Sequence, residues 1–396
     1  MEISKRKVIR TSTVPGSLRA LLKGQLAFLN QYFDVIAVSG NGKSLEHVKE
    51  TEGVRTFALE MQRQISPVND FISLLKLYLL FKREKPHIVH SITPKAGLLS
   101  MLAAKLAGVP IRMHTFTGLI FPSKKGSLQK LLIKMDQLLC WAATDVFPEG
   151  EGVKKDLINF GITTKPLKVL ANGNINGIDF NYYDPAAYSD LQKQELRQSL
   201  NINQNDFVFV FVGRLVRDKG INELVVAFNS LLPMVDKDES KRLKLVLVGY
   251  YEQHLDPLLP ETVKEIEDNQ QIIFTGAQSD VRPYYAISDC LVFPSYREGF
   301  PNVVLEAGAM SLPSIVTDIS GNNEIIETGY NGIIVPKYDT ELLMENMLYL
   351  FKNNEARIEM AINSRKNIIE KYDRQLVWNA VLNEYKAALA GKNISN

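Results

Sequence analysis

The sequence predicts two doubly wound α/β domains, each built on a parallel sheet with helices on both faces. Three observations lead to this prediction. The chain has 396 residues, enough for two or three domains. Short apolar runs alternate with longer segments whose apolar residues recur at i, i+3 and i+4, as in a sheet with crossover helices. The alternation starts again after residue 200, which divides the pattern into two halves.

In the first half, short apolar runs indicate strands and the longer periodic segments between them indicate helices. We expect strands at 7–11, 34–39, 55–59, 87–92, 111–116, 145–149 and 167–171, and helices at 18–32, 66–84, 95–108 and 127–143.

In the second half, the strand-like runs are almost continuously apolar, which is typical of a sheet covered on both faces. They lie at 207–213, 244–249, 271–276, 290–294, 313–317 and 332–336. The Gly- and Asn-rich segment 171–185 indicates a turn-rich connection between the domains. We place the first domain at 1–172 and the second at 173–375, with a final helix in 376–396 that no strand follows.

Composition excludes several classes of protein. Apolar residues make up 45% of the chain and charged residues 23%, which excludes disorder as the main state. Two cysteines, Cys140 and Cys290, exclude a disulfide scaffold and are expected to be buried. Five scattered histidines indicate no structural zinc site. Because the polar N-terminus does not resemble a secretory signal and no apolar run reaches membrane-spanning length, we expect a cytoplasmic protein.

Charge is distributed unevenly along the chain. Residues 1–170 carry 25 Lys and Arg against 13 Asp and Glu, a net charge of +12, whereas the remainder carries −10. This is either chance variation among surface charges or a basic half that meets an anionic partner. Nucleic acid is disfavoured, because no basic stripe with interleaved aromatic residues is present.

Two nucleotide-binding patterns are weak here. Residues 37–44 match a loose P-loop pattern, but Ala37 lies inside an expected strand and leaves little room for a phosphate-cradling loop. No G-x-G-x-x-G follows a strand, so NAD binding lacks its main support. Gly16 lies at the sharp turn between the first strand and the next helix. There it is either a simple helix entry or a place where the backbone approaches a phosphate.

The segment 207–224 predicts a phosphate site more strongly. A buried strand ends at Gly213, Arg214 follows at its carboxyl end, and Lys219 with Gly220 opens the next helix. Two cations beside a helix N-terminus are suited to bind a diphosphate. The same two residues could also be ordinary surface charges of a loop.

The segment 290–317 places two carboxylates near the end of another strand. Glu298 follows this strand in a loop, and Glu306 lies about one turn into a helix expected from residue 302. Carboxylates accept paired hydrogen bonds from vicinal hydroxyls, as in sugars and ribose. Taken alone, the spacing also fits a surface glutamate and a glutamate that stabilises the helix dipole.

Together these motifs resemble a known family. E-G-F-P-N-V-V-L-E-A at 298–307 and G-R-L-x-x-x-K-G at 213–220 are similar to the retaining glycosyltransferases of family 4, which have the GT-B fold. The resemblance covers most of the chain. Segments 89–118 and 169–185 look like the branch that extends lipid-linked saccharides in capsule, O-antigen and N-glycan assembly.

The resemblance implies roles for the residues of the second half. Gly213, Arg214 and Lys219 would hold the nucleotide diphosphate, and Glu306 would hold the ribose hydroxyls. Glu298 would contact the donor sugar, in a pocket also shaped by Gly299, Phe300 and Asn302.

In the first half, the resemblance implies that His114 borders the donor sugar and that Gly16 forms the front turn near the phosphates. Many relatives have two histidines where this chain has His90 and Ile92, so we interpret His90 as a strand histidine with satisfied hydrogen bonds. The final helix would cross back to the first domain, and the two domains would face each other across a cleft.

The implied activity is transfer of a sugar from a nucleotide-sugar, UDP-linked and with N-acetylhexosamine among the candidates, to a saccharide on a polyprenyl diphosphate. The reaction would retain stereochemistry and need no metal, cofactor or dedicated general base. Three rival functions remain. One is a sugar-nucleotide 2-epimerase of similar two-domain shape, which would lack the combined motifs above; the others are a P-loop NTPase and a sugar-nucleotide sensor without activity.

Because the implied acceptor is embedded in a membrane, we expect the first domain to dock on the anionic inner face of the cytoplasmic membrane. The expected contacts are an exposed Phe121 and four lysines, Lys124, Lys125, Lys130 and Lys134. These lysines could instead simply solvate the start of a helix.

Overall fold

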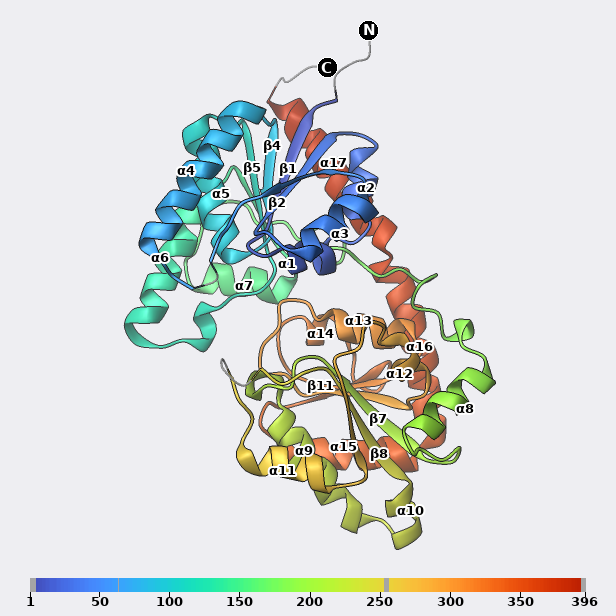
Figure 1. The fold of residues 1–396 in the computed structure, drawn as a ribbon. Helices are drawn as coiled ribbons and strands as arrows, with labels where there is room; N and C mark the ends of the chain where they lie inside the picture. The colour runs from blue at the N-terminus through green and yellow to red at the C-terminus, as the bar shows by residue number, and fades with distance from the viewer. Residues whose placement is uncertain (1–4, 63, 253–255, 393–396) are drawn as a thin grey trace. The chain divides into compact units, whose positions relative to one another are not determined.

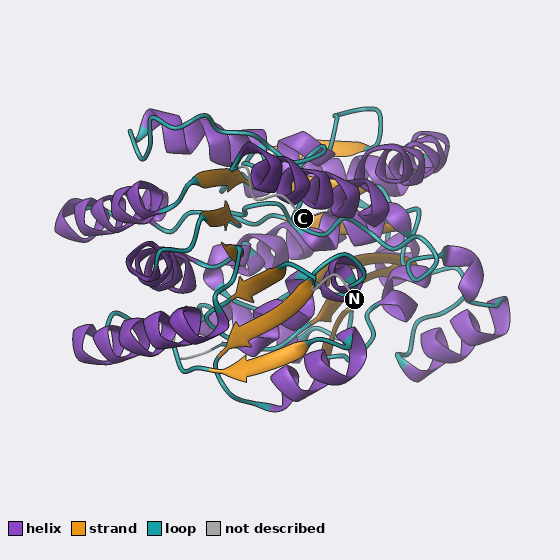
Figure 2. Cartoon of the chain, turned by 90° about the horizontal axis from the view of Figure 1, so that it is seen from above, coloured by secondary structure: helices purple, strands orange, loops and turns teal. Residues whose placement is uncertain are grey.

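The structure is a computed structural model that describes residues 5–62, 64–252 and 256–392. The chain divides into two compact units, Met1–Gly177 with Arg374–Asn396, and Ile178–Asp373 (Figure 1). Each unit contains a six-stranded parallel sheet, and the strands lie between helices (Figure 2). The predicted class, two doubly wound α/β domains, is therefore confirmed.

The first unit has the strand order β3-β2-β1-β4-β5-β6. Its strands are β1 (Lys7–Thr11), β2 (Asp34–Ser39), β3 (Arg55–Ala58), β4 (Ile88–Ser91), β5 (Ile111–Phe116) and β6 (Asp145–Pro148). Its helices are α1 (Pro15–Leu21), α2 (Gln25–Asn30), α3 (Lys43–Glu52), α4 (Pro67–Glu84), α5 (Pro94–Ala107), the 3₁₀ turn η1 (Phe121–Ser123), α6 (Gly126–Ala142), α7 (Glu151–Asn159) and α17 (Arg374–Gly391).

The second unit repeats this topology with the order β12-β11-β10-β7-β8-β9. Its strands are β7 (Phe207–Val212), β8 (Leu243–Val248), β9 (Ile272–Gly276), β10 (Cys290–Phe293), β11 (Ser314–Thr317) and β12 (Gly332–Val335). Its α-helices are α8 (Asp190–Ser199), α9 (Ile221–Leu231), α10 (Lys237–Arg242), α11 (Pro260–Asp268), α12 (Arg282–Ala286), α13 (Asn302–Ala309), α14 (Asn322–Ile325), α15 (Thr340–Lys352) and α16 (Asn354–Tyr372). Its 3₁₀ turns are η2 (Pro185–Ala187), η3 (Arg217–Lys219) and η4 (Leu232–Met234).

The central strands are buried along their whole length, as their apolar sequences predict. Every residue of β7 and β10 is buried, and both free cysteines lie in buried positions. The edge strand β3 is more exposed and has the mixed sequence RTFA. In both units the strand order reverses direction where the first strand of the unit meets the fourth, which is where doubly wound sheets bind ligands.

Two predicted elements of the first unit are wrong. The run 167–171 is not a strand, and only Leu167 forms a single bridge to Val146. Pro166 has no N–H to extend that pairing, and Ala171 adopts a positive φ of 50°. The expected helix 18–32 is divided into α1 and α2 at Gly24, whose φ is 80° and whose added Cβ would lie 2.7 Å from a ring atom of Trp378.

The last helix, α17, belongs to the first unit. It lies beside α2 in Figure 1 and buries Trp378, Val381, Leu382, Tyr385 and Leu389 in the core of that unit. These positions recur at helical spacing, so one face of α17 is apolar. The helix is therefore a fixed part of the first unit.

Phe121 is not the exposed residue that the sequence suggested. It is 0% exposed in η1, where its ring packs edge-on against Phe160 with 5.0 Å between ring centroids. Within the described ranges, no helix combines the length and apolarity needed to cross a lipid bilayer.

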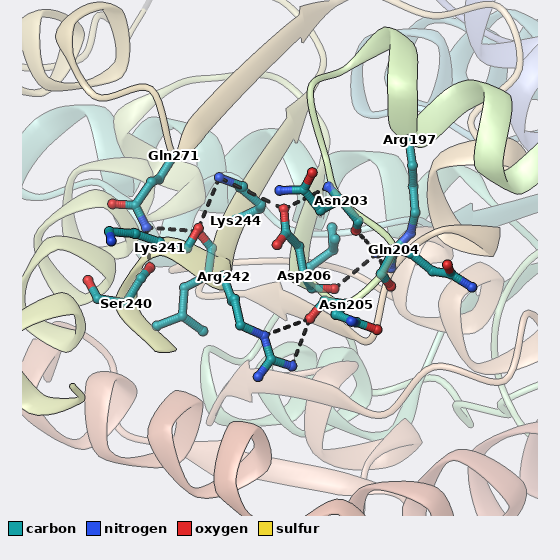
Figure 3. A network of polar contacts seen from close by, with 12 residues as sticks. Arg197, Asn203, Gln204, Asn205, Asp206, Ser240, Lys241, Arg242, Lys244 and Gln271 are labelled. Carbon is teal, nitrogen blue, oxygen red and sulfur yellow. Dashed lines mark hydrogen bonds and ion pairs between the residues drawn. The ribbon is translucent and has the colours of Figure 1, made fainter. Parts of the chain in front are cut away.

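A closed polar network lies at the amino ends of the strands in the second unit (Figure 3). The Arg242 guanidinium donates to the Asn205 carbonyl, and Gln271 donates to the Leu243 carbonyl at 2.9 Å. The Lys244 ammonium lies 4.0 Å from the Asp206 carboxylate. These contacts pair main-chain carbonyls at the edge opposite the strand ends that carry the charged motifs, so we interpret the network as structural.

The carboxyl group of Asp136, on α6, is buried enough to make the stability of the fold depend on pH. Burial raises the pKa of its carboxyl group to about 7, whereas an unfolded chain has an aspartate pKa of about 3.9. The folded state therefore binds the proton more tightly. The free energy of unfolding should fall between pH ~4 and ~7, by at most ~1.4 kcal/mol per pH unit.

We expect Asp136→Asn to remove this decline, so its melting temperature should exceed that of the wild type at pH 8 and approach it near pH 4. Asp190→Asn is the matched control, because that side chain is 95% exposed. The same pH dependence in wild type and Asp136→Asn would contradict the assignment.

Candidate active site

The charged motifs of the second half meet at one edge of the second sheet. The loops after β7, β10 and β11 all leave the carboxyl ends of parallel strands, so they lie on the same side of the sheet. Arg214 and Lys219 lie in the first of these loops and Glu298 in the second. This is the edge at which ligands bind in open α/β sheets.

Lys219 and Glu298 form an ion pair that joins the two motifs. The Lys219 ammonium donates to Glu298 Oε1, and the Ser295 hydroxyl donates to the same oxygen at 2.8 Å. The side chains of Lys219 and Glu298 are only 17% and 15% exposed. The Lys219 ammonium also lies 5.2 Å from the centre of the Phe293 ring. A cation and a carboxylate are thus held side by side at the strand ends.

Two glycines allow the backbone to approach closely enough to form this pair. Gly220 has a φ of 70°, and a Cβ there would lie 2.1 Å from the Pro294 carbonyl oxygen. Gly321, in the loop after β11, has a φ of 82°, and its Cβ would lie 2.6 Å from the Gly299 carbonyl oxygen. Any side chain at either position would push the loops apart.

Arg214 lies in the same loop as Lys219 but has its own partner. Its guanidinium forms an ion pair with Glu252, and its side chain is 40% exposed. It follows Gly213, whose amide donates to the Val248 carbonyl at 2.9 Å. The exposed part of Arg214 leaves a cation within reach of solvent at this edge.

The hydroxyl groups of two tyrosines hold the Glu306 carboxylate in place. The buried Tyr285 hydroxyl donates to Glu306 Oε2 at 3.1 Å. Burial and the nearby Glu306 carboxylate together raise the pKa of both Tyr285 and Tyr183. Both phenols therefore remain protonated, and they fix the carboxylate as hydrogen-bond donors.

The remaining predicted residues of this loop lie at the start of α13. The helix begins at Asn302, as expected, and Pro301 is its N-cap residue. Gly299 and Phe300 are packed into the unit, and the Phe300 ring lies against Tyr372 with 5.5 Å between ring centroids. Phe300 thus supports the loop from inside the unit.

In the first unit, Gly16 lies in the first turn of α1, directly after Pro15. No heavy atom lies within 4 Å of the Cβ that a side chain would add there. Gly16 therefore borders open space at the carboxyl end of β1, but this geometry does not require glycine.

His114 is enclosed in the core of the first unit. Its side chain is buried on β5, and its Nδ1 hydrogen-bonds the Ser91 hydroxyl at 2.8 Å. Burial lowers the pKa of His114 to about 3, so the imidazole is neutral. Its Nε2 has no hydrogen-bond partner among the described residues. A Cβ on Gly97 would lie 2.5 Å from the ring, so this glycine makes room for the histidine.

His90 has both ring nitrogens satisfied, as expected for a strand histidine. Its Nδ1 hydrogen-bonds the Tyr385 hydroxyl at 2.7 Å, and its Nε2 hydrogen-bonds the Thr115 hydroxyl at 2.8 Å.

Sequence reasoning missed Ser295, Tyr285, Tyr183, Gly321 and Glu252. Ser295 follows the strand end three positions before Glu298 and could have been noticed there. Tyr183 lies in the segment 169–185 that carries the family resemblance, but nothing there indicated a contact with Glu306. The other three come from segments without a motif, and only the folded chain brings them to the site. In the described part of the chain, no group of three or more His, Cys, Asp or Glu side chains is placed to hold a metal ion.

Comparisons with known proteins identify the family of the chain. The family described as Glycosyl transferases group 1 matches residues 192–367, and the Glycosyl transferase 4-like domain matches residues 27–173. The capsular polysaccharide biosynthesis glycosyltransferase CapM of Staphylococcus aureus is 32% identical over 97% of this chain and 98% of its own length.

Another relative, from Escherichia coli, is the UDP-Gal:alpha-D-GlcNAc-diphosphoundecaprenol alpha-1,3-galactosyltransferase, 28% identical over 93% of this chain and 94% of its own. The crystal structure of Anabaena Alr3699/HepE in complex with UDP and glucose has the same fold, with a TM-score of 0.80 and 18% identity over 96% of this chain and 100% of that one. The chain thus belongs to the family 4 glycosyltransferases with the GT-B fold.

Proposed function

We propose that this glycosyltransferase moves a sugar from a UDP-linked donor to a saccharide carried on a polyprenyl diphosphate, in the assembly of a surface polysaccharide. The observation that carries the proposal is the pair of Lys219 and Glu298 at the strand ends of the second unit. It places a cation for a diphosphate beside a carboxylate for sugar hydroxyls. The names of the S. aureus and E. coli relatives support the acceptor class and the pathway.

The proposed chemistry needs few protein groups. As the bond from the sugar to the diphosphate breaks, negative charge gathers on the leaving phosphate, and donors already in place stabilise that charge. Lys219 and the exposed end of Arg214 are such donors, so no metal is needed. In a reaction that retains stereochemistry by front-side displacement, the leaving phosphate oxygen takes the acceptor's proton. No dedicated base is then required.

The ion pair also suggests how the donor is held. A diphosphate would draw the Lys219 ammonium away from Glu298, and that carboxylate would then need new hydrogen-bond donors. The hydroxyls of the donor sugar can supply them. Phosphate binding and sugar binding are thereby linked through one pair of side chains.

A panel of ligands tests this function. UDP-glucose, UDP-galactose and their N-acetylhexosamine counterparts, at 100 times the dissociation constant, should each stabilise the fold by ~2.7 kcal/mol if bound. Transfer to a polyprenyl-diphosphate saccharide would distinguish a transferase from a sensor. Formation of the 2-epimer would instead indicate an epimerase, and hydrolysis of ATP would indicate a P-loop NTPase.

Replacing Lys219 by Ala should lower turnover by roughly 10²–10³, as for other single donors to a developing charge. Steady-state transfer rates measure this effect. Lys244→Ala is the matched control, because Lys244 is similarly buried, 12% exposed, and lies in the network at the opposite edge of the sheet (Figure 3). It should lower stability but leave turnover unchanged. Normal turnover in Lys219→Ala would refute the role.

Replacing Glu306 by Ala should weaken binding of free UDP about 10-fold or more, since hydrogen bonds to a charged group contribute roughly 1.5–3 kcal/mol. Glu298→Ala should not weaken UDP binding, because UDP carries no sugar for Glu298 to contact and no ion pair then has to be separated. Calorimetric titration measures both variants. With 2′-deoxy-UDP, wild type and Glu306→Ala should bind more nearly alike. Equal loss of UDP affinity in both variants would contradict this division of roles.

We also propose that the enzyme works on the anionic inner face of the cytoplasmic membrane, where such an acceptor would be embedded. Phe121 is buried and cannot enter the lipid, whereas the four predicted lysines are exposed. Other apolar side chains of the first unit would then supply the apolar part of the contact. Exposed large apolar side chains form a stripe at helical spacing along α4 and a second stripe along α6. The two stripes comprise Val68, Phe71, Ile72, Leu75 and Leu79, and Leu128, Leu131, Leu138 and Trp141.

The charges beside these stripes favour an anionic surface. Lys76, Lys82, Lys130 and Lys134 are exposed on the same two helices. Each lysine near an anionic leaflet contributes about 1 kcal/mol. Apolar side chains would enter the interface while the lysines meet the headgroups.

Sedimentation with vesicles tests this docking. Binding should rise with the anionic lipid fraction and fall with salt, because exposed charges are screened over about 8 Å at physiological ionic strength. Leu79→Ser should weaken binding by about 10-fold, the loss of one buried leucine. Ile362→Ser is the control, since both side chains are 64% exposed and Ile362 lies in the second unit. Equal binding to neutral and anionic vesicles would overturn the proposal.

A further inference from the structure

Tyr338 has an unusual backbone conformation in an exposed loop. It lies between β12 and α15 with a φ of 66°, a region that bulky side chains rarely adopt, and it is 64% exposed. Strain of this kind costs about 1–3 kcal/mol and gathers at functional sites. The loop leaves the carboxyl end of β12, so it lies at the same edge of the sheet as Glu298.

The Tyr338 ring rests on a second tyrosine of the candidate site. Its centroid lies 4.2 Å from that of Tyr296, with 45° between the ring planes. Two hydrogen bonds hold Tyr296 in place. Its amide donates to the Asp218 carbonyl at 2.9 Å, and its hydroxyl hydrogen-bonds the Glu223 carboxylate, which together with burial raises its pKa. The upper ring is therefore presented to solvent on a rigid support.

Charged groups border these rings. Arg297, next to Tyr296 in the chain, is paired with the Asp218 carboxylate at 2.7 Å, and both side chains are partly exposed. A sugar ring has an apolar C–H face and a rim of hydroxyl groups. Aromatic rings suit the first, and a carboxylate with a guanidinium suits the second.

We propose that Tyr338 and Tyr296 form a binding platform for a sugar ring, with Asp218 and Arg297 at its rim. This inference rests on the proposed function, because it assigns a contact for one of its two sugar substrates. The strained backbone of Tyr338 is then explained by the ring position that it enforces. The sugar belongs either to the nucleotide-linked donor or to the acceptor, and the test separates these sources.

Three variants separate binding from stability. Tyr338→Phe keeps the ring, whereas Tyr338→Ala and Tyr338→Gly both remove it. Glycine tolerates a positive φ, so the glycine variant should melt ~2–4 °C higher than the alanine variant. If the ring binds sugar, both variants should nonetheless lose the same amount of affinity for the sugar substrate. If the tyrosine were only structural, function would follow the melting temperature.

The measurements are the Kd of UDP, the Kd of the UDP-sugar that the wild type uses, and KM for N-acetylglucosamine linked through a diphosphate to a short polyprenol. We expect Tyr338→Ala and Tyr338→Gly to weaken the binding of one sugar substrate by roughly 10-fold, while the Kd of UDP stays within twofold. A higher Kd for the UDP-sugar would assign the platform to the donor. A higher KM for the acceptor, with the Kd of the UDP-sugar unchanged, would assign it to the acceptor. Tyr338→Phe should resemble the wild type.

Unchanged constants for both sugar substrates in the alanine and glycine variants would overturn the platform and leave the proposed function intact. An equal loss for UDP itself would also overturn it, since the contact would then be with the nucleotide. A wild type that uses none of the UDP-sugars would overturn the proposed function and the platform together.

Discussion

Two opposite charges that are largely withdrawn from water must stay together, and the candidate site of the second unit depends on this constraint. Lys219 and Glu298 are 79 positions apart in the chain. Leaving either charge buried without its partner would cost several kcal/mol. The loops that carry them are therefore held in contact, and Gly220 and Gly321 permit the close backbone approach that this contact needs. The same two charges are the groups that a sugar diphosphate requires.

Most of the fold follows from local apolar patterns. The strands of the second unit are nearly continuous apolar runs, so their positions could be predicted to within a residue or two. Two of the failures lie where tertiary contacts override the local pattern. Gly24 interrupts a periodic helix because Trp378, more than 350 positions away, packs against its backbone. Phe121 is followed closely by the polar run Ser123, Lys124 and Lys125, yet the fold encloses its ring against Phe160.

The site was less predictable than the fold. That the charged residues directly after apolar strands lie together could be predicted, because parallel strands bring their carboxyl ends to one edge. The side chains that contact these residues from other segments could not be predicted in this way. No pattern in the sequence links Tyr285 or Tyr183 to Glu306, and only the three-dimensional structure shows that they surround it. The role of His114 beside the donor sugar stays a prediction from the resemblance. The structure shows its side chain buried and neutral, with no hydrogen-bond partner for its Nε2 among the described residues.

The ion pair has a consequence for selectivity under the proposed function. A diphosphate that attracts Lys219 withdraws the main counter-charge of Glu298, and the Ser295 hydroxyl still donates to that carboxylate. A nucleotide without a sugar offers nothing in exchange. A complete donor brings hydroxyl groups that can replace the lost ammonium, so it restores the hydrogen bonds that phosphate binding removes. The energetic cost of separating the pair therefore falls mainly on ligands that lack the sugar, and a feature that stabilises the empty site also favours the complete substrate.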